Sequence, residues 1–146
     1  MAHHKIRCVK DYEFIEHTAD ISIRVKGNDL IALFRNAALA MFDIAAQKKE
    51  AQAEGKTRLQ ISLKADNLDE LFVNWLNELL SLSATKYLIF SDFQINKLDN
   101  SILEAVAIGE NTANYKVNTE IKAATYHQLK LEESKTGWQA EIIFDV

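Results

Sequence analysis

The spacing of apolar residues changes period twice along the first part of this chain, each time in the same order. Residues 19–26 alternate between apolar and polar side chains, as a strand does, and residues 30–41 then carry apolar side chains every three or four positions. The same order returns at 57–65 and 68–82. The pattern predicts strand, helix, strand, helix, and it places Trp75 on the buried stripe of the second helix.

The remainder of the chain shows only strand patterns. Residues 88–98 and 101–109 flank Asp99-Asn100, a pair typical of turns, which predicts a hairpin. Residues 115–131 alternate as one long strand, and a final strand runs to Phe144. A doubly wound parallel sheet does not fit, because no helix separates these strands. We therefore expect a single α+β domain over 1–146, with a mixed or antiparallel sheet of about six strands and two main helices packed on one side.

Composition excludes several classes of function. The net charge is -4 and the pI is about 5.6, values that argue against a broad phosphate-binding surface. Cys8 is the only cysteine, so no intrachain disulfide forms, and no apolar run is long enough to span a membrane. We expect a cytoplasmic protein that does not bind a membrane.

Three ionisable residues, Glu16, His17 and Asp20, lie within five positions just before the first strand. A carboxylate within hydrogen-bond reach of an imidazole is the usual pair in general base catalysis. The same residue types are also common turn formers and caps. Taken alone, the stretch is compatible with either role.

The other end of the chain concentrates oxygen ligands. Asp145 is followed only by Val146, so a side-chain carboxylate and a main-chain carboxylate lie close together. Oxygen ligands of this kind suit a hard cation such as Ca²⁺ or Mg²⁺. A solvated, frayed terminus is the alternative, but the apolar alternation continues to Phe144 and favours a terminus docked in the sheet. A zinc site has little support, because Cys8, His17 and His127 lack the close paired spacing of zinc modules.

Several stretches together resemble one known family, archease. They are "YEFIEHTADISIRVKGNDLIALFRNAALAMFDI" near the start, "LDELFVNWLNELLSL" in the middle, and "IKAATYHQLKLEE" with "GWQAEIIFDV" at the end. The front stretch and the ending in aspartate and an aliphatic residue occur together and in order, which makes the resemblance specific. It covers most of the chain.

The resemblance implies a function. Archeases are small cytosolic accessory proteins of the GTP-dependent RNA ligase that joins 2′,3′-cyclic-phosphate or 3′-phosphate ends to 5′-hydroxyl ends in tRNA splicing or RNA repair. They promote ligase guanylylation and multiple turnover, and they meet RNA only through the ligase. They also bind a divalent cation, for which Ca²⁺ is the first expectation and Mg²⁺ or Mn²⁺ the alternatives. On this reading the chain is an activator and not itself an enzyme.

The resemblance also assigns residues. The metal ligands would be Asp20, Asp145 and the backbone or terminal carboxylate of Val146, which meet if the first and last strands are neighbours in the sheet. Positions that matter for ligase activation correspond to Asp29 and Lys122. Glu16 and His17 belong to the same front motif and take supporting roles.

The chain departs from the family pattern at two places, and two other functions compete with ligase activation. Ser22 stands where many relatives have glycine, and Ile31-Ala32 where they carry an acidic pair. The first competing function is an independent metal-dependent hydrolase that uses His17 as a base beside a cation on Asp20 and Asp145. The second is a general chaperone-like module that binds other proteins.

Overall fold

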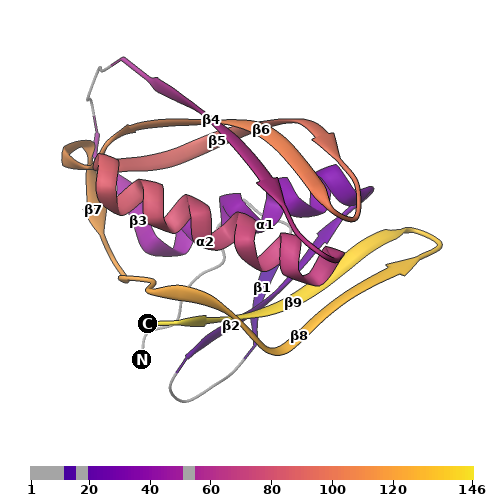
Figure 1. The fold of residues 1–146 in the computed structure, drawn as a ribbon. Helices are drawn as coiled ribbons and strands as arrows, with labels where there is room; N and C mark the ends of the chain where they lie inside the picture. Colours follow the sequence, from indigo (N-terminus) through magenta and orange to yellow (C-terminus); the bar gives the residue numbers. More distant parts are fainter. Residues whose placement is uncertain (1–11, 16–19, 51–54) are drawn as a thin grey trace.

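The computed structural model describes residues 12–15, 20–50 and 55–146, and it shows two helices between two antiparallel sheets (Figure 1). Helix α1 contacts β2 of one sheet and β5 of the other, and helix α2 contacts β8 of one and β4 and β5 of the other. Each sheet therefore has helices on one of its faces, and the predicted α+β class is confirmed.

The larger sheet has the strand order β1-β2-β9-β8, and the second has the order β4-β6-β5. A short third sheet pairs β3 with β7. The elements in chain order are β1 (Tyr12–Ile15), β2 (Ile21–Gly27), α1 (Leu30–Ala45), β3 (Ala46–Lys48), β4 (Thr57–Lys64), α2 (Leu68–Lys86), β5 (Leu88–Leu98), β6 (Ile102–Asn111), the 3₁₀ helix η1 (Thr112–Asn114), β7 (Tyr115–Val117), β8 (Ala123–Ser134) and β9 (Gly137–Asp145).

Both helices begin at the polar residues that the sequence predicts. The side chain of Asp29 accepts a hydrogen bond from the backbone N–H of Ala32, and that of Asn67 accepts one from Glu70. Trp75 is fully buried in α2, and its indole N–H donates to the carbonyl oxygen of Phe34 in α1 at 2.9 Å. Trp75 is therefore a core residue, as the sequence predicts.

The number and grouping of the strands differ from the expectation of about six in one sheet. The described residues form nine strands in three sheets. The predicted long strand over 115–131 is wrong, because β7 ends at Val117 and pairs with β3, whereas β8 starts at Ala123 and pairs with β9. Alternation continues through this region, but it carries no information about which strand is the partner.

Strand β8 also contains a bulge. Thr125 pairs with Ile143 and Lys130 with Glu141, so four residues of β8 lie opposite a single residue of β9. Within the bulge Gln128 has a φ of 55°, and Tyr126 is more than half exposed. The regular alternation that the sequence suggests is therefore interrupted at 126–129.

Two glycines allow α1 and the β8–β9 turn to approach the end of β2. A Cβ atom on Gly27 would lie 2.3 Å from the backbone nitrogen of Leu33 in α1. Gly137 has a φ of +138°, and a Cβ there would lie 2.5 Å from the carbonyl oxygen of Gly27. Only glycine fits these two positions without a shift of the backbone, so they fix how the helix sits against the sheet.

Candidate functional site

The second strand of the chain, β2, and the last, β9, are direct neighbours in the larger sheet. β2 and β9 are antiparallel, with Ile21 opposite Phe144 as their outermost pair. Asp20 comes directly before Ile21 and Asp145 directly after Phe144, so both residues lie beside this outermost pair. The sheet thus brings together two carboxylates that lie at opposite ends of the sequence.

Lys122, the residue just before β8, lies at the same place. The backbone N–H of Lys122 donates to the carbonyl oxygen of Asp145 at 2.7 Å, and Ala123 pairs with Asp145 in the ladder. The side chains of Lys122 and Asp145 are exposed. We call Asp20, Lys122, Asp145 and Val146 the carboxylate end of the molecule.

The carboxylate end rests on a rigid support. Phe144, next to Asp145, is fully buried, and Ile121, next to Lys122, is 8% exposed. The side-chain amide of Asn77 in α2 donates to the carbonyl oxygen of Ala124 at 3.0 Å and accepts from its N–H at 2.8 Å. These two bonds take the place of a neighbouring strand at the edge of β8. The backbone next to the exposed Lys122 and Asp145 is therefore hydrogen-bonded on both sides.

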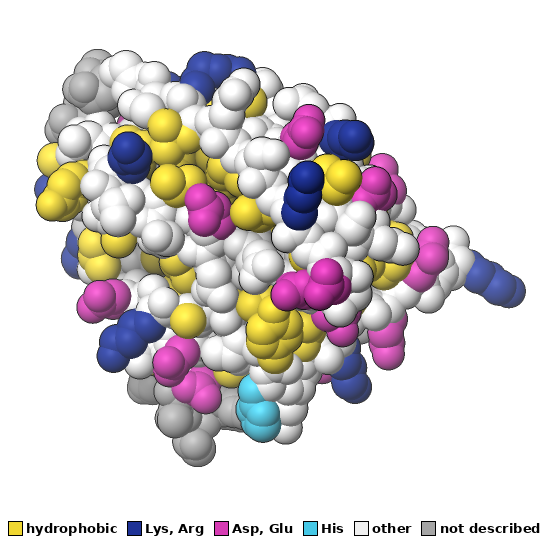
Figure 2. Space-filling model, in the orientation of Figure 1, with side chains coloured by type: hydrophobic (Ala, Val, Ile, Leu, Met, Phe, Trp, Pro, Cys, Tyr) yellow, Lys and Arg dark blue, Asp and Glu magenta, His cyan; other side chains and the backbone are white. Residues whose placement is uncertain are grey.

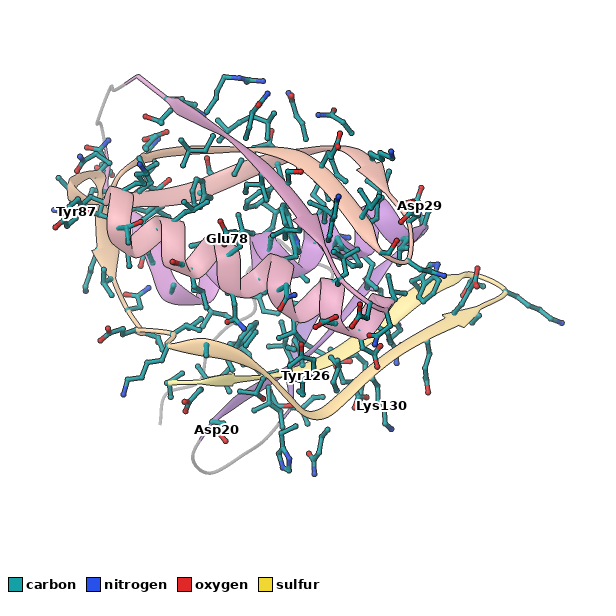
Figure 3. All side chains as sticks on the ribbon, in the orientation of Figure 1. Asp20, Asp29, Glu78, Tyr87, Tyr126 and Lys130 are labelled. Carbon is teal, nitrogen blue, oxygen red and sulfur yellow. The ribbon has the colours of Figure 1, made fainter. Side chains whose placement is uncertain are left out.

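Asp29 does not join this group. Figure 3 shows Asp20 and Asp29 at opposite ends of the molecule, because β2 runs between them. The seven residues of β2 span roughly 23 Å. At its own end, Asp29 accepts the backbone N–H of Ala32 at 2.8 Å and so caps α1. The residues that the resemblance assigns are therefore divided between two separate places.

A shallow pocket of about 350 Å³ opens near Asp29. One wall comes from the end of β2 and the start of α1, and the other from the β8–β9 turn, where Trp138 is half-buried. Asn36 in α1 closes the first wall by donating to the carbonyl oxygen of Lys26 at 2.9 Å. Sequence reasoning missed this pocket, because its two walls are far apart in the chain and share no motif.

Glu16 and His17 lie outside the described residues, and so does Cys8. The structure therefore describes the carboxylate end and Asp29 among the predicted site residues. Within the described ranges, no group of three or more His, Cys, Asp and Glu side chains could hold a metal. Asp20 and Asp145 are two carboxylates at the same end of the larger sheet.

No helix in the described part of the chain is long and apolar enough to cross a membrane. Helix α2, the longest, carries Asp69, Glu70 and Glu78. Figure 2 shows acidic, basic and hydrophobic side chains intermingled on the face where α2 lies.

Comparison with known proteins identifies relatives over nearly the whole chain. The model of the Archease protein family (MTH1598/TM1083) matches residues 12–146. The archease of Methanosarcina acetivorans is 38% identical, and the match covers 94% of this chain and 97% of that protein. The archease of Pyrococcus furiosus is 34% identical over 94% of this chain and 100% of its own length.

Solved structures share the fold. The solution structure of protein 1598 of Methanobacterium thermoautotrophicum aligns with a TM-score of 0.73 and 30% identity, covering 93% of this chain and 99% of that chain. The crystal structure of a Thermotoga maritima protein, described as an archease and possible chaperone, aligns with a TM-score of 0.62 and 23% identity over 99% of this chain and 100% of that chain. From the family model and the sequence relatives, we conclude that the chain belongs to the archease family.

Proposed function

We propose that this protein is an accessory protein that activates a GTP-dependent RNA ligase, as its membership of the archease family suggests. The ligase joins RNA 3′-phosphate or 2′,3′-cyclic-phosphate ends to 5′-hydroxyl ends. The accessory protein promotes guanylylation of the ligase and its multiple turnover in tRNA splicing or RNA repair. The chemistry belongs to the ligase.

The observation that carries this proposal is the register of β2 against β9. It brings Asp20 and Asp145 to the same end of the larger sheet, where the backbone N–H of Lys122 donates to the carbonyl oxygen of Asp145. A small acidic projection on a rigid support is suited to enter a cationic cleft of a partner that binds phosphates. The exposed side chain of Lys122, beside Asp145, adds a donor for an acidic or phosphate group.

The donor atoms of the carboxylate end suit a hard divalent cation. Ca²⁺ takes about six to eight oxygen ligands, and two carboxylates that face each other repel unless a cation lies between them. Asp20, Asp145 and the main-chain oxygens of Val146 would hold it, with water or the ligase filling the remaining positions. We propose Ca²⁺, with Mg²⁺ or Mn²⁺ as alternatives. The cation would present positive charge to the nucleotide phosphates in the ligase pocket.

The test is a guanylylation assay with purified ligase, GTP and the divalent metal, with and without this protein. We expect the wild-type protein to accelerate formation of the ligase–guanylate intermediate. Asp145→Ala should reduce the acceleration at least about tenfold. Glu133→Ala is the matched control, because Glu133 is an exposed carboxylate on β8 that pairs with Trp138, at the other end of that strand.

Three outcomes would contradict the proposal. No acceleration by the wild-type protein would remove the accessory role. Turnover of RNA or nucleotide by this protein alone would favour the metal-dependent hydrolase, whose base would be His17. Protection of the ligase from aggregation without any change in guanylylation would favour the general chaperone, the activity suggested for the Thermotoga maritima relative.

A further inference from the structure

Lysines gather around one exposed tyrosine at the end of the molecule where α2 stops. The set comprises Lys48, Lys49, Lys56, Lys86, Tyr87 and Lys116, and we call it the lysine–tyrosine surface. It is built from the C-terminus of α2, the residues that flank η1, and the short β3–β7 sheet, which lie side by side at the left of Figure 1. Figure 2 shows basic and hydrophobic side chains together at this end.

Backbone contacts hold these elements together. The N–H of Thr112 donates to the carbonyl oxygen of Tyr87 at 3.0 Å, which ties the end of α2 to η1. Lys49 donates through its backbone N–H to Asn114 at 2.9 Å and through Nζ to the carbonyl oxygen of Ala113 at 3.2 Å. In the β3–β7 sheet, Gln47 pairs with Lys116. The lysine–tyrosine surface is therefore one continuous region.

The charge of this region is positive although the whole chain is negative. It contains five lysines, whereas the described carboxylates close to them are Glu50, Glu110 and Asp92, and Asp92 is paired with Arg35 at 2.6 Å. Glu110 is 2% exposed and lies beneath the surface, where its carboxylate accepts Lys48 Nζ at 3.0 Å and lies 3.8 Å from Lys56 Nζ. The hydrogen bond from Lys48 holds the pKa of Glu110 below its usual value. Lys86 and Lys116 form no ion pair within the described residues.

Tyr87 projects from this region. It follows the last residue of α2 in the left-handed conformation, with φ 57° and ψ 49°, a position where glycine is the usual residue. Its side chain is 68% exposed, and Figure 3 shows Tyr87 at the edge of the molecule where α2 ends. Neither packing nor helix termination requires an aromatic ring here.

We propose that the lysine–tyrosine surface binds single-stranded nucleic acid. The ring of Tyr87 offers a flat face on which a base can stack, and the exposed Lys86 and Lys116 can neutralise phosphates. This surface is small, which is compatible with a net negative chain that has no broad phosphate-binding face. The proposal does not depend on ligase activation, because it concerns the lysine–tyrosine surface and not the carboxylate end. It is tested with this protein alone.

The first test is fluorescence anisotropy of a labelled oligouridylate of about 12 nucleotides with the full chain alone at low salt. Tyr87→Gly should weaken binding roughly tenfold, because one stacked base is lost. It should leave thermal stability unchanged or higher, because glycine adopts the left-handed conformation without strain. Tyr126→Ala is the matched control, since Tyr126 is an exposed tyrosine on β8 outside this surface; it should leave binding unchanged.

The second test reverses charge at two places. Lys86→Glu with Lys116→Glu should lower affinity more than tenfold and reduce the slope of log affinity against log salt by about 1.4. The control is Lys97→Glu with Lys135→Glu, which changes the net charge of the protein by the same amount at exposed lysines of β5 and the β8–β9 turn. It should have little effect on the affinity. Equal loss in both double variants, or binding that tolerates Tyr87→Gly, would overturn the proposal. Tighter binding of polyglutamate than of the oligonucleotide would also overturn it and point to an acidic protein segment.

Discussion

The two ends of the β2–β9 pair carry aspartates in contrasting surroundings. At one end, Asp29 caps α1, and the adjacent Gly27 and Gly137 make close backbone contacts. At the other end, Asp20 precedes β2, Asp145 ends β9, and Lys122 lies beside Asp145. Within the described ranges, no hydrogen bond or ion pair involves the side chains of these three residues. The first end is built for internal contacts, and the second presents oxygen ligands to the exterior.

The difference indicates how to separate structural from functional carboxylates in this protein. A carboxylate that accepts a backbone N–H is accounted for by the fold, because its removal leaves an orphan donor at a helix end. A carboxylate that is supported by buried neighbours and has no partner among the residues the structure describes can accept a ligand. Asp29 belongs to the first kind, and Asp145 to the second.

The largest expected effect tests the internal end. Gly27→Ala should lower the free energy of unfolding by about 3 kcal/mol, because its Cβ would collide with the backbone of Leu33 in α1. Urea denaturation measures the loss. Gly55→Ala is the matched control: a Cβ there meets nothing within 4 Å, so stability should change little. Equal stability of both variants would mean that the two ends do not differ in packing.

The next effect tests the carboxylate end through its metal. Ca²⁺ at about 100 times its dissociation constant should raise the free energy of unfolding by about 2.7 kcal/mol, and removal by EDTA should reverse this. Asp20→Ala and Asp145→Ala should each abolish the increase, whereas Asp29→Ala should retain it. Thermal unfolding with and without Ca²⁺ gives the readout. An increase that survives Asp145→Ala would place the cation elsewhere.

A smaller effect concerns Asp29 itself. Asp29→Ala should cost about 1 kcal/mol through loss of the N-cap of α1, and Asp29→Ser should restore most of it, since serine also caps helices. Ligase guanylylation measured with both variants sharpens the comparison. If Asp29 acts by positioning α1, Asp29→Ser keeps the stimulation. Loss of stimulation in a stably folded Asp29→Ser would show that the carboxylate itself contacts the partner.

The smallest effect uses Glu110 as a reference for a carboxylate with lysine partners. Its pKa is lowered in the folded state by the hydrogen bond from Lys48, so its contribution to stability is full above its ordinary pKa and is lost as the pH falls through the lowered value. The contribution is at most about 1 kcal/mol, because both lysines are half exposed. Stability followed below the ordinary pKa of 4.5 should fall less steeply in Glu110→Gln. An unchanged slope would exclude Glu110 as a source of acid sensitivity.

Much of the fold follows from local sequence patterns. The alternation around Ile23 and Ile142 predicts strands with those side chains buried, and both are fully buried. The helical spacing and the caps at Asp29 and Asn67 predict α1 and α2. These predictions succeed because the period of apolar residues depends on the backbone geometry of one segment and on which of its faces meets the core.

Tertiary structure alone decided which segments are partners. The alternation over 115–131 predicts one strand, but the chain pairs with β3 only as far as Val117 and pairs with β9 from Ala123 onward. The same non-local pairing brings Asp20 and Asp145 to one end of β2 and β9 and leaves Asp29 at the other end. It also brings together Tyr87 and the five lysines of the lysine–tyrosine surface, which come from four separate segments of the chain. Strand partners are selected by the packing of the whole core, and residues far apart in the chain contribute to that free energy together, so no local pattern contains it.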